Sequence, residues 1–339
     1  MNAWQDTLAA LIEAATPAVL VTVAAIKGSA PRGTGAVMIV TERGLEGTIG
    51  GGRLEYRAAR VARTMLRGGP AARLKEFPLG PELGQCCGGH VSLHFQRVSA
   101  ADRAWLDPVR DWIAKGGRAA LVFDPNDEAG RRLAVSAAHI AGDLGSQTAA
   151  AVRAARKTLS GSVADEGEFI VLPVTPPDCV VYLFGAGHVG RALAAILGHL
   201  PCRLVWIDER EDAFPLFNPA NASTIRTTDP ADEAAKAPTG AYFLVMTHSH
   251  ARDQAIVEAV LRRGDFAYLG LIGSATKRAR FAARLCAAGL SEAALQRLVC
   301  PIGDGIPGKE PGVIALAAAA EIMRLHRAGA VHARLARSA

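Results

Sequence analysis

Three glycine-rich segments in the first half of the chain combine residue types suited to anion binding and thiol chemistry. They are residues 28–32, 47–55 and 80–89, and the third contains the adjacent cysteines Cys86 and Cys87. Glycine loops that precede a helix expose backbone N–H groups and the positive end of the helix dipole, and both favour anions. The same amides can lower the pKa of nearby thiols. The segments therefore predict an anion-binding site with reactive cysteines.

Arginines at two of these segments support this interpretation. Arg32 ends the first segment and Arg53 follows the triple glycine, and either guanidinium can form bidentate contacts with a phosphate. A structural role is the alternative, because glycines often only form turns and cysteine pairs often pack in the interior. Three such segments in one domain favour a site. Its predicted residues are Ser29, Arg32, Gly50, Gly51, Gly52, Arg53, Glu55, Gln85, Cys86 and Cys87.

The second half of the chain carries the glycine fingerprint of dinucleotide-binding domains. An apolar stretch at 180–184 leads into Gly185, Gly187 and Gly190, spaced as GxGxxG, and then into an apolar helix. These glycines allow a tight turn, the approach of a pyrophosphate and close helix packing. Asp208 follows at about the 20-residue spacing from which a carboxylate reaches a ribose hydroxyl. We predict a nucleotide site here, with a nucleotide fold that no longer binds its ligand as the alternative.

A histidine pair occurs where a later strand of this half should end. His248 and His250 precede Asp253, a pattern that suggests a metal-dependent hydrolase. In the familiar HxHxD motif the acid stands two residues after the second histidine, whereas here it stands three residues after it. The alternative is that Asp253 begins or caps a helix. We therefore expect His248 and His250 to line the ligand crevice.

Two patterns of secondary structure must position these residues. The first part has strand-like stretches at 18–26, 36–40 and 89–96 mixed with helices, as in an α+β domain. From residue 178 strands and helices alternate regularly, which favours a parallel sheet of the Rossmann type.

The proline-rich segment 172–178 separates the two patterns, since prolines continue neither a helix nor a central strand. The sequence therefore predicts an α/β protein in three parts. These are an N-terminal α+β domain with glycine-rich loops at 1–174, a C-terminal Rossmann-type domain at 178–328, and a basic tail at 329–339.

Composition limits the classes of protein to which the chain can belong. Its 339 residues, 50% of them hydrophobic, suffice for two globular cores. The net charge of +6 comes with no nucleic-acid-binding module, so we expect no nucleic-acid partner. Neither a secretory signal nor a membrane-spanning apolar run is evident, and we expect a cytoplasmic protein without membrane contact. The six cysteines show no CxxC spacing, which argues against a zinc site or a disulfide framework.

The motifs of both halves resemble those of the XdhC/CoxI family of xanthine dehydrogenase accessory proteins. In the first half the matching pieces are GSAPR at 28–32, GTIGGGRLE at 47–55 and GPELGQCCGG at 80–89. In the second half they are FGAGHVGR at 184–191, THSHARD at 247–253, GLIGS at 270–274 and CPIG at 300–303. The resemblance spans nearly the whole chain.

This resemblance implies a chaperone rather than an enzyme. Such a protein binds and protects the molybdenum cofactor, presents it for sulfuration and inserts it into apo-xanthine dehydrogenase. The implied partners are the xanthine dehydrogenase molybdenum subunit, a cysteine desulfurase and molybdenum cofactor biosynthesis proteins, and we expect a homodimer. Arg32 or Arg53 with the loop amides suits the phosphate of molybdopterin, and Cys86 or Cys87 offers a soft thiolate to molybdenum. A nucleotide in the Rossmann domain is a further expectation.

Three other functions remain open, and two of them are each suggested by a single motif. An NAD(P)-dependent oxidoreductase would use the GxGxxG fingerprint, and a metal-dependent hydrolase would use segment 247–253. Both leave the glycine-rich segments of the first half unexplained. A nucleotidyltransferase ranks last, because its LAGGxSxRMG signature is absent from the sequence.

Overall fold

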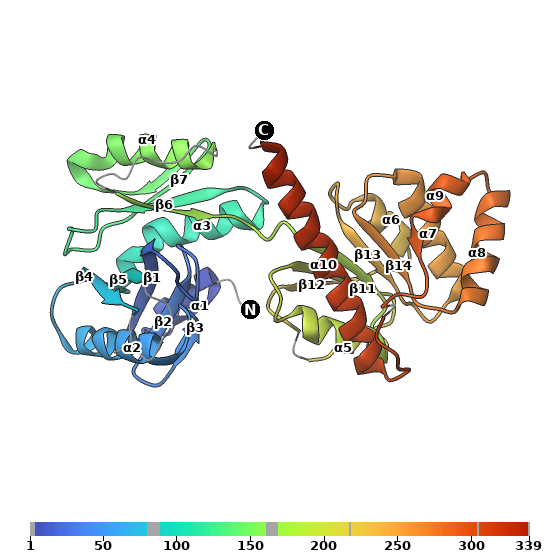
Figure 1. Ribbon diagram of the computed structural model, residues 1–339, viewed down its shortest axis with the longest axis horizontal. Coiled ribbons are helices and arrows are strands. Elements are labelled where there is room, and N and C mark those ends of the chain that lie inside the picture. Colours follow the sequence, from blue (N-terminus) through green and yellow to red (C-terminus); the bar gives the residue numbers. More distant parts are fainter. Residues whose placement is uncertain (1–3, 80–88, 161–168, 217, 304, 338–339) are drawn as a thin grey trace. The chain divides into compact units, whose positions relative to one another are not determined.

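The computed structural model describes residues 4–79, 89–160, 169–216, 218–303 and 305–337. The chain divides into two units, Asn2–Pro176 and Pro177–Ala339 (Figure 1). The division falls within the proline-rich segment 172–178, whose first three residues still belong to an edge strand of the N-terminal unit.

The N-terminal unit begins with a five-stranded antiparallel sheet in the order β3-β2-β1-β5-β4. The strands are β1 (Ala18–Lys27), β2 (Val37–Thr41), β3 (Leu45–Gly47), β4 (Ala72–Pro78) and β5 (His90–Arg97). Successive side chains of a strand point to opposite faces. Val19 and Val21 of β1 therefore pack with helix α2 (Gly52–Arg67), whereas Leu20 joins the core on the other side. Burial on both faces explains the unbroken apolar run of this strand.

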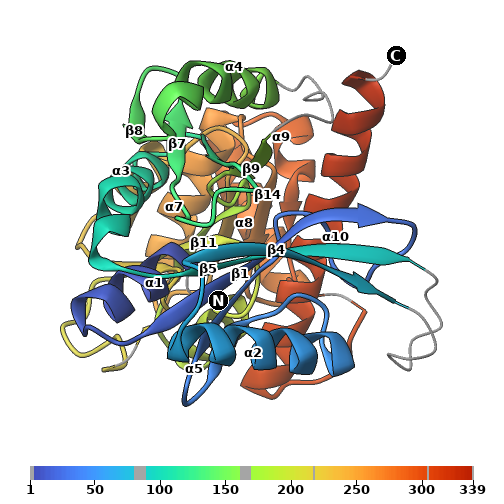
Figure 2. The same ribbon diagram turned by 90° about the vertical axis from the view of Figure 1, so that its left-hand side faces the viewer.

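A second antiparallel sheet completes the N-terminal unit, in the order β8-β7-β6-β9. Its strands are β6 (Ala119–Phe123), β7 (Leu133–Ser136), β8 (Ile140–Gly142) and β9 (Ile170–Val174). Helices α1 (Trp4–Glu13) and α3 (Arg103–Ala114) share one core with both sheets. Helix α4 (Thr148–Leu159) covers the other face of the second sheet, as Figure 2 shows from a second direction.

The C-terminal unit contains a six-stranded parallel sheet in the order β12-β11-β10-β13-β14-β15. The strands are β10 (Val180–Phe184), β11 (Arg203–Asp208), β12 (Ala222–Arg226), β13 (Tyr242–Val245), β14 (Tyr268–Leu271) and β15 (Leu298–Val299). Numbered along the chain, this is the 3-2-1-4-5-6 order of dinucleotide-binding domains. The structure confirms the predicted Rossmann-type domain after an α+β domain.

Helices cover both faces of the parallel sheet. One face carries α5 (His188–Leu197) and α10 (Pro311–Arg337), and the other carries α6 (Pro230–Ala235), α7 (His250–Arg263), α8 (Ala275–Ala287) and α9 (Glu292–Gln296). Helix α10 continues to Arg337 and so includes most of the segment 329–339 that the sequence suggested as a tail. Within the described ranges, no helix is both long enough and apolar enough to cross a membrane.

Candidate functional site

The described parts of the glycine-rich segments of the N-terminal unit meet at one end of two central strands of the five-stranded sheet. Strands β1 and β5 are antiparallel neighbours, and Lys27 at the end of β1 stands opposite His90 at the start of β5. Segment 28–32 leaves the sheet at this point, and the described end of segment 80–89 enters it there. The β1–β5 pairing therefore brings together two segments that lie far apart in the sequence.

Close backbone contacts show how tightly these segments pack. A side-chain carbon at Gly89 would lie 2.3 Å from the carbonyl oxygen of Ser29. One at Gly50 would lie 2.7 Å from Cβ of Pro31. Gly50 and Gly89 thus allow segment 47–55 and the end of segment 80–89 to pack directly on segment 28–32. The described parts of the three segments therefore pack together, in a region that we call the glycine edge.

The amides of the triple-glycine loop already have an anionic partner within the chain. Glu55 Oε1 accepts hydrogen bonds from the amides of Ile49 at 3.0 Å, Gly50 at 3.2 Å and Gly51 at 2.8 Å. The hydroxyl of Thr48 also donates to this oxygen. Burial alone would raise the pKa of Glu55, but these hydrogen bonds outweigh it and lower the pKa. Glu55 therefore occupies the amides that the sequence suggested for an external anion.

Three other predicted residues lie at the surface of the glycine edge. Ser29, Arg32 and Arg53 are exposed, and Arg53 is the second residue of α2. Gln85, Cys86 and Cys87 lie outside the described residues, so their part in a site stays a prediction. In the described part of the glycine edge, Glu55 binds the amides of Ile49, Gly50 and Gly51, and Arg32 and Arg53 are exposed.

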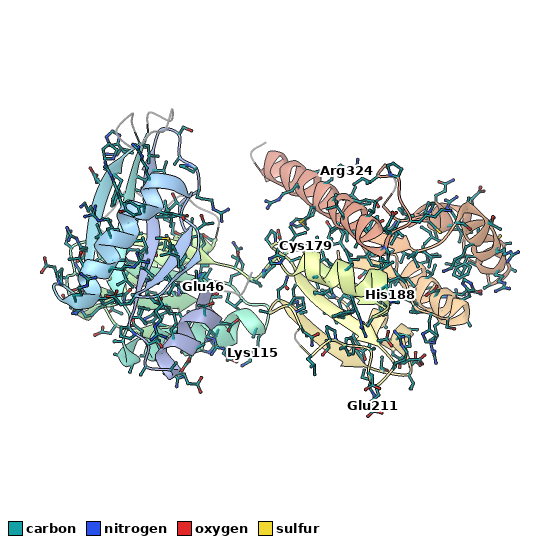
Figure 3. The ribbon with its side chains drawn as sticks, turned by 90° about the horizontal axis from the view of Figure 1, so that it is seen from below. Glu46, Lys115, Cys179, His188, Glu211 and Arg324 are labelled. Atoms are coloured by element: carbon teal, nitrogen blue, oxygen red, sulfur yellow. The ribbon has the colours of Figure 1, made fainter. Side chains whose placement is uncertain are left out.

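The fingerprint of the C-terminal unit has the strand–turn–helix context that the motif requires. Gly185 follows β10, and α5 begins at His188, labelled in Figure 3, with Gly187 as its N-cap. A side-chain carbon at Gly190 would lie 2.1 Å from the carbonyl oxygen of Gly185, whereas one at Gly187 would meet nothing within 4 Å. Gly190 is thus needed for close packing, and Gly187 leaves its backbone open to a ligand.

Asp208 ends β11 beside this loop, but its carboxylate is already paired. Oδ2 accepts a hydrogen bond from the Ala186 amide at 2.7 Å, and Arg210 binds both oxygens, each at 2.9 Å. Burial alone would raise the pKa of Asp208, but the hydrogen bonds from Arg210 and Ala186 lower it to about 2. The carboxylate therefore binds the end of β11 to the glycine loop at Ala186. A ribose would have to share it with Arg210.

His248 faces a carboxylate that the sequence did not single out. Its Nε2 lies 3.1 Å from Glu209 Oε1, and Arg252 donates a hydrogen bond to the same oxygen. Glu209 follows β11 and His248 lies after β13, and these two strands flank β10. The contact therefore crosses the carboxyl end of the strand that leads into the fingerprint. The position of Glu209 directly after Asp208 is the signal by which it could have been found.

Thr247, Ser249 and Asp253 of segment 247–253 have structural roles, whereas His250 is exposed. His250 is the first residue of α7 and Ser249 is its N-cap, so the expectation that Asp253 begins or caps this helix is wrong. Asp253 is 1% exposed and accepts hydrogen bonds from Thr247 Oγ1 and Lys277 Nζ, both at 2.7 Å. It ties α7 to α8 and to the end of β13. In the described part of the chain, no three His, Cys, Asp or Glu side chains are grouped to hold a metal.

The fold defines a class of protein in which an α+β unit with clustered glycine loops is followed by a Rossmann-type unit. Residues 11–78 match the model of the XdhC and CoxI family, and residues 181–322 match the XdhC Rossmann domain. The two matches together cover more than half of the chain. The chain belongs to the XdhC and CoxI family. Members of this family are accessory or maturation factors rather than catalytic enzymes.

Individual relatives show the same likeness along the whole chain. A protein of Bacillus subtilis (strain 168), named as a probable xanthine dehydrogenase subunit, is 24% identical over 348 residues, which include 98% of this chain and 100% of the relative. A crystal structure from Bacillus halodurans, described as a xanthine dehydrogenase, has a TM-score of 0.74 at 22% identity and covers 97% of this chain and 96% of its own. At this identity the structure supports the fold alone.

Proposed function

We propose that this protein is a molybdenum cofactor chaperone that takes part in the maturation of a xanthine dehydrogenase. Family membership and the name of the Bacillus subtilis relative support a role beside that enzyme. The observation that carries the proposal is the packing of Gly50 and Gly89 on segment 28–32. Because of this packing, one ligand can contact residues of all three glycine-rich segments.

The residue types of the glycine edge suit two parts of the cofactor. Molybdopterin carries a phosphate, which the guanidinium groups of Arg32 and Arg53 can bind. Since Glu55 occupies three loop amides, the arginines supply the main attraction for this phosphate. Cys86 or Cys87 supplies a soft thiolate toward molybdenum. The protein then protects the cofactor, presents it for sulfuration and inserts it into the apo-enzyme.

The proposal includes partners and a second ligand. The partners are the molybdenum subunit of xanthine dehydrogenase, a cysteine desulfurase and the proteins that synthesise the cofactor, and the chaperone acts as a cytoplasmic homodimer. In the C-terminal unit, the open backbone at Gly187 supports binding of a nucleotide. The site of cofactor transfer is the glycine edge of the N-terminal unit.

The experiment that tests this function follows molybdenum from the chaperone to the enzyme. Purified protein is incubated with molybdenum cofactor and separated by gel filtration, and the complex is added to apo-xanthine dehydrogenase. We expect molybdenum to elute with the protein and enzyme activity to appear. If the protein binds no molybdenum, the chaperone function is refuted.

Variants then locate the cofactor. Arg32→Met should reduce the molybdenum bound, and Arg43→Met, at an exposed position between β2 and β3, is the matched control. Cys86→Ala and Cys87→Ala are tested singly. Full retention of molybdenum in both cysteine variants would remove the thiols from the site, and equal losses in the two arginine variants would remove Arg32.

A further inference from the structure

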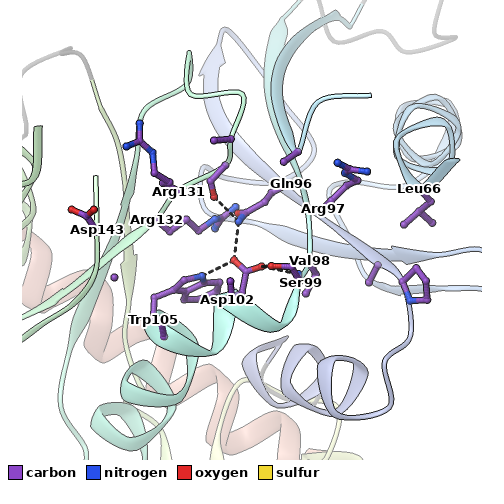
Figure 4. Close-up of a pocket in the computed structure, with 18 residues that line it drawn as sticks. Leu66, Gln96, Arg97, Val98, Ser99, Asp102, Trp105, Arg131, Arg132 and Asp143 are labelled. Atoms are coloured by element: carbon purple, nitrogen blue, oxygen red, sulfur yellow. Dashed lines mark hydrogen bonds between the residues drawn. The ribbon is translucent and has the colours of Figure 1, made fainter. Parts of the chain in front are cut away.

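The N-terminal unit contains a pocket of about 830 Å³ away from the glycine edge. Gln96 of β5, Asp102 and Trp105 at the start of α3, and Arg132 next to β7 line it (Figure 4). Leu66 near the C-terminal end of α2 also lines it, whereas the triple-glycine loop precedes the N-terminus of this helix. A rise of 1.5 Å per residue over 16 residues places about 24 Å between the two ends.

The guanidinium group of Arg132 is buried in the wall of this pocket without a hydrogen-bond partner. The residue is 3% exposed, and none of its Nε, Nη1 and Nη2 atoms bonds to any described residue. Its Cζ lies 4.9 Å from the ring centre of Phe123 and 5.5 Å from that of Trp105. Aromatic faces attract a cation, but they leave its N–H donors unsatisfied. Buried charges are normally both paired and hydrogen-bonded.

The charged and titratable neighbours do not supply the missing acceptor. Asp102 attracts Arg132, but its Oδ1 already accepts hydrogen bonds from Gln96 at 2.9 Å and from Trp105 at 2.8 Å. Burial and the charge of Arg132 lower the pKa of His94 to about 2, so His94 is neutral at physiological pH. Burial lowers the pKa of Arg132 only to about 10, so Arg132 stays protonated. The cation therefore remains without an acceptor.

Other buried polar atoms near Arg132 also have no partner among the described residues. They are Thr22 Oγ1, His94 Nδ1 and Gln96 Oε1. Thr22 and His94 stand opposite each other on β1 and β5, and Gln96 lies two residues further along β5. Thr22 and Arg132 also line one small cavity together. A hydroxyl and a guanidinium thus offer donors to the same interior region.

We propose that Arg132 anchors an oxyanion, the phosphate or carboxylate group of a small molecule that enters this pocket. A guanidinium presents its N–H donors in pairs that match the oxygens of such a group. Three arginines line the pocket, Arg97, Arg131 and Arg132, against two carboxylates, Asp102 and Asp143, and the excess of positive charge favours the entry of an anion. The site lies at the opposite end of α2 from the glycine edge, so it is a separate site that goes beyond the proposed cofactor function.

The test is the thermal stability of the full-length protein in phosphate, in acetate and in chloride at equal ionic strength. A ligand that binds only the folded state raises the unfolding temperature. At ten times its Kd, we expect phosphate or acetate to raise the transition of the N-terminal unit by about 4 °C above chloride. The more effective anion identifies the group that the site prefers.

Two variants separate anion binding at Arg132 from a general effect of charge. Arg132→Met should lose the shift, and Arg43→Met, which removes an exposed charge outside the pocket lining, should keep it. If Arg132→Met does not fold, Arg132→Lys keeps a cation without the paired donors and should weaken binding about tenfold. The proposal fails if neither anion shifts the wild-type transition, because water would then suffice for Arg132. It also fails if the variant at Arg132 responds as strongly as the variant at Arg43.

Discussion

The carboxylate of Glu55 accepts a hydrogen bond from the amide of Gly51 at 2.8 Å. Both residues belong to segment 47–55, and this contact folds the loop back onto the first turn of α2. A loop closed by its own residue is already ordered before a ligand binds, which reduces the entropy cost of binding. A substitution of Glu55 tests whether its hydrogen bonds stabilise this loop.

Replacement of Glu55 by glutamine should destabilise the N-terminal unit. An amide oxygen carries no charge, so the hydrogen bonds from Ile49, Gly50 and Gly51 lose their charge-assisted character. We expect a loss of about 1–2 kcal/mol in the free energy of unfolding, measured by urea denaturation at neutral pH. Glu46→Gln on β3 is the control, because Glu46 is exposed. Figure 3 labels this residue. Equal stability of the two variants would contradict the role of Glu55.

The buried side chain of His94 should make the stability of the N-terminal unit depend on pH. Its pKa is lowered to about 2, whereas an ordinary histidine has a pKa of 6.5. Below pH 6.5 the unfolded chain takes up a proton that the folded chain does not. Stability therefore falls as the pH falls, by about 1.4 kcal/mol per pH unit for this group.

The variant His94→Phe isolates this contribution. It keeps an aromatic ring beside Phe123, whose ring centre lies 4.1 Å from that of His94. Urea denaturation at about pH 6 and about pH 5, above the range in which most carboxylates titrate, should show a smaller loss of stability for this variant. His139→Phe, at an exposed position, should behave like the wild type. An unchanged slope in His94→Phe would show that His94 does not resist protonation.

The fingerprint loop should tolerate a methyl group at one glycine and not at another. Gly190→Ala would place a carbon 2.1 Å from the Gly185 carbonyl oxygen, so α5 must move away from the loop. We expect this variant to lose about 1–3 kcal/mol of stability in the C-terminal unit, measured by calorimetry. Gly187→Ala meets nothing within 4 Å and should cost less than about 1 kcal/mol as an N-cap change. The reverse order of the two losses would contradict the close approach at Gly190.

The ion pair between Lys277 and Asp253 should be essential to the C-terminal unit. Asp253 is 1% exposed, and the Lys277 ammonium lies 2.7 Å from its Oδ2. Lys277→Met leaves a buried carboxylate without its cation and should cost about 3–5 kcal/mol. Lys236→Met removes an exposed partner of Glu233 and should cost less than about 1 kcal/mol. The double variant Lys277→Met with Asp253→Asn should recover part of the lost stability in the same calorimetric experiment. No recovery would mean that the unpaired carboxylate charge does not cause the destabilisation.

Local patterns in the sequence predict the elements that carry the two sites. The apolar run at 18–26 corresponds to β1 (Ala18–Lys27), and the stretch at 180–184 corresponds to β10 (Val180–Phe184). Glycine spacing after β10 predicts the turn into α5. Such patterns act over a few neighbouring residues, so the sequence contains the information for them.

Short edge elements depend on contacts with distant residues. Helix α9 (Glu292–Gln296) is followed after one residue by β15 (Leu298–Val299). Strand β15 forms because Leu298 stands opposite Leu269 on β14. A two-residue strand has no periodicity of its own, so only its pairing defines it.

The sequence by itself determined the two-part fold, the glycine loops and the family to which they belong. Tertiary structure alone decided which partner each polar group has. Packing places the imidazole of His248 beside Glu209, and it buries Arg132 near Thr22 without an acceptor among the described residues. The physical reason is that hydrogen bonds and burial depend on how strands and helices pack, and packing brings together residues that are distant in the chain.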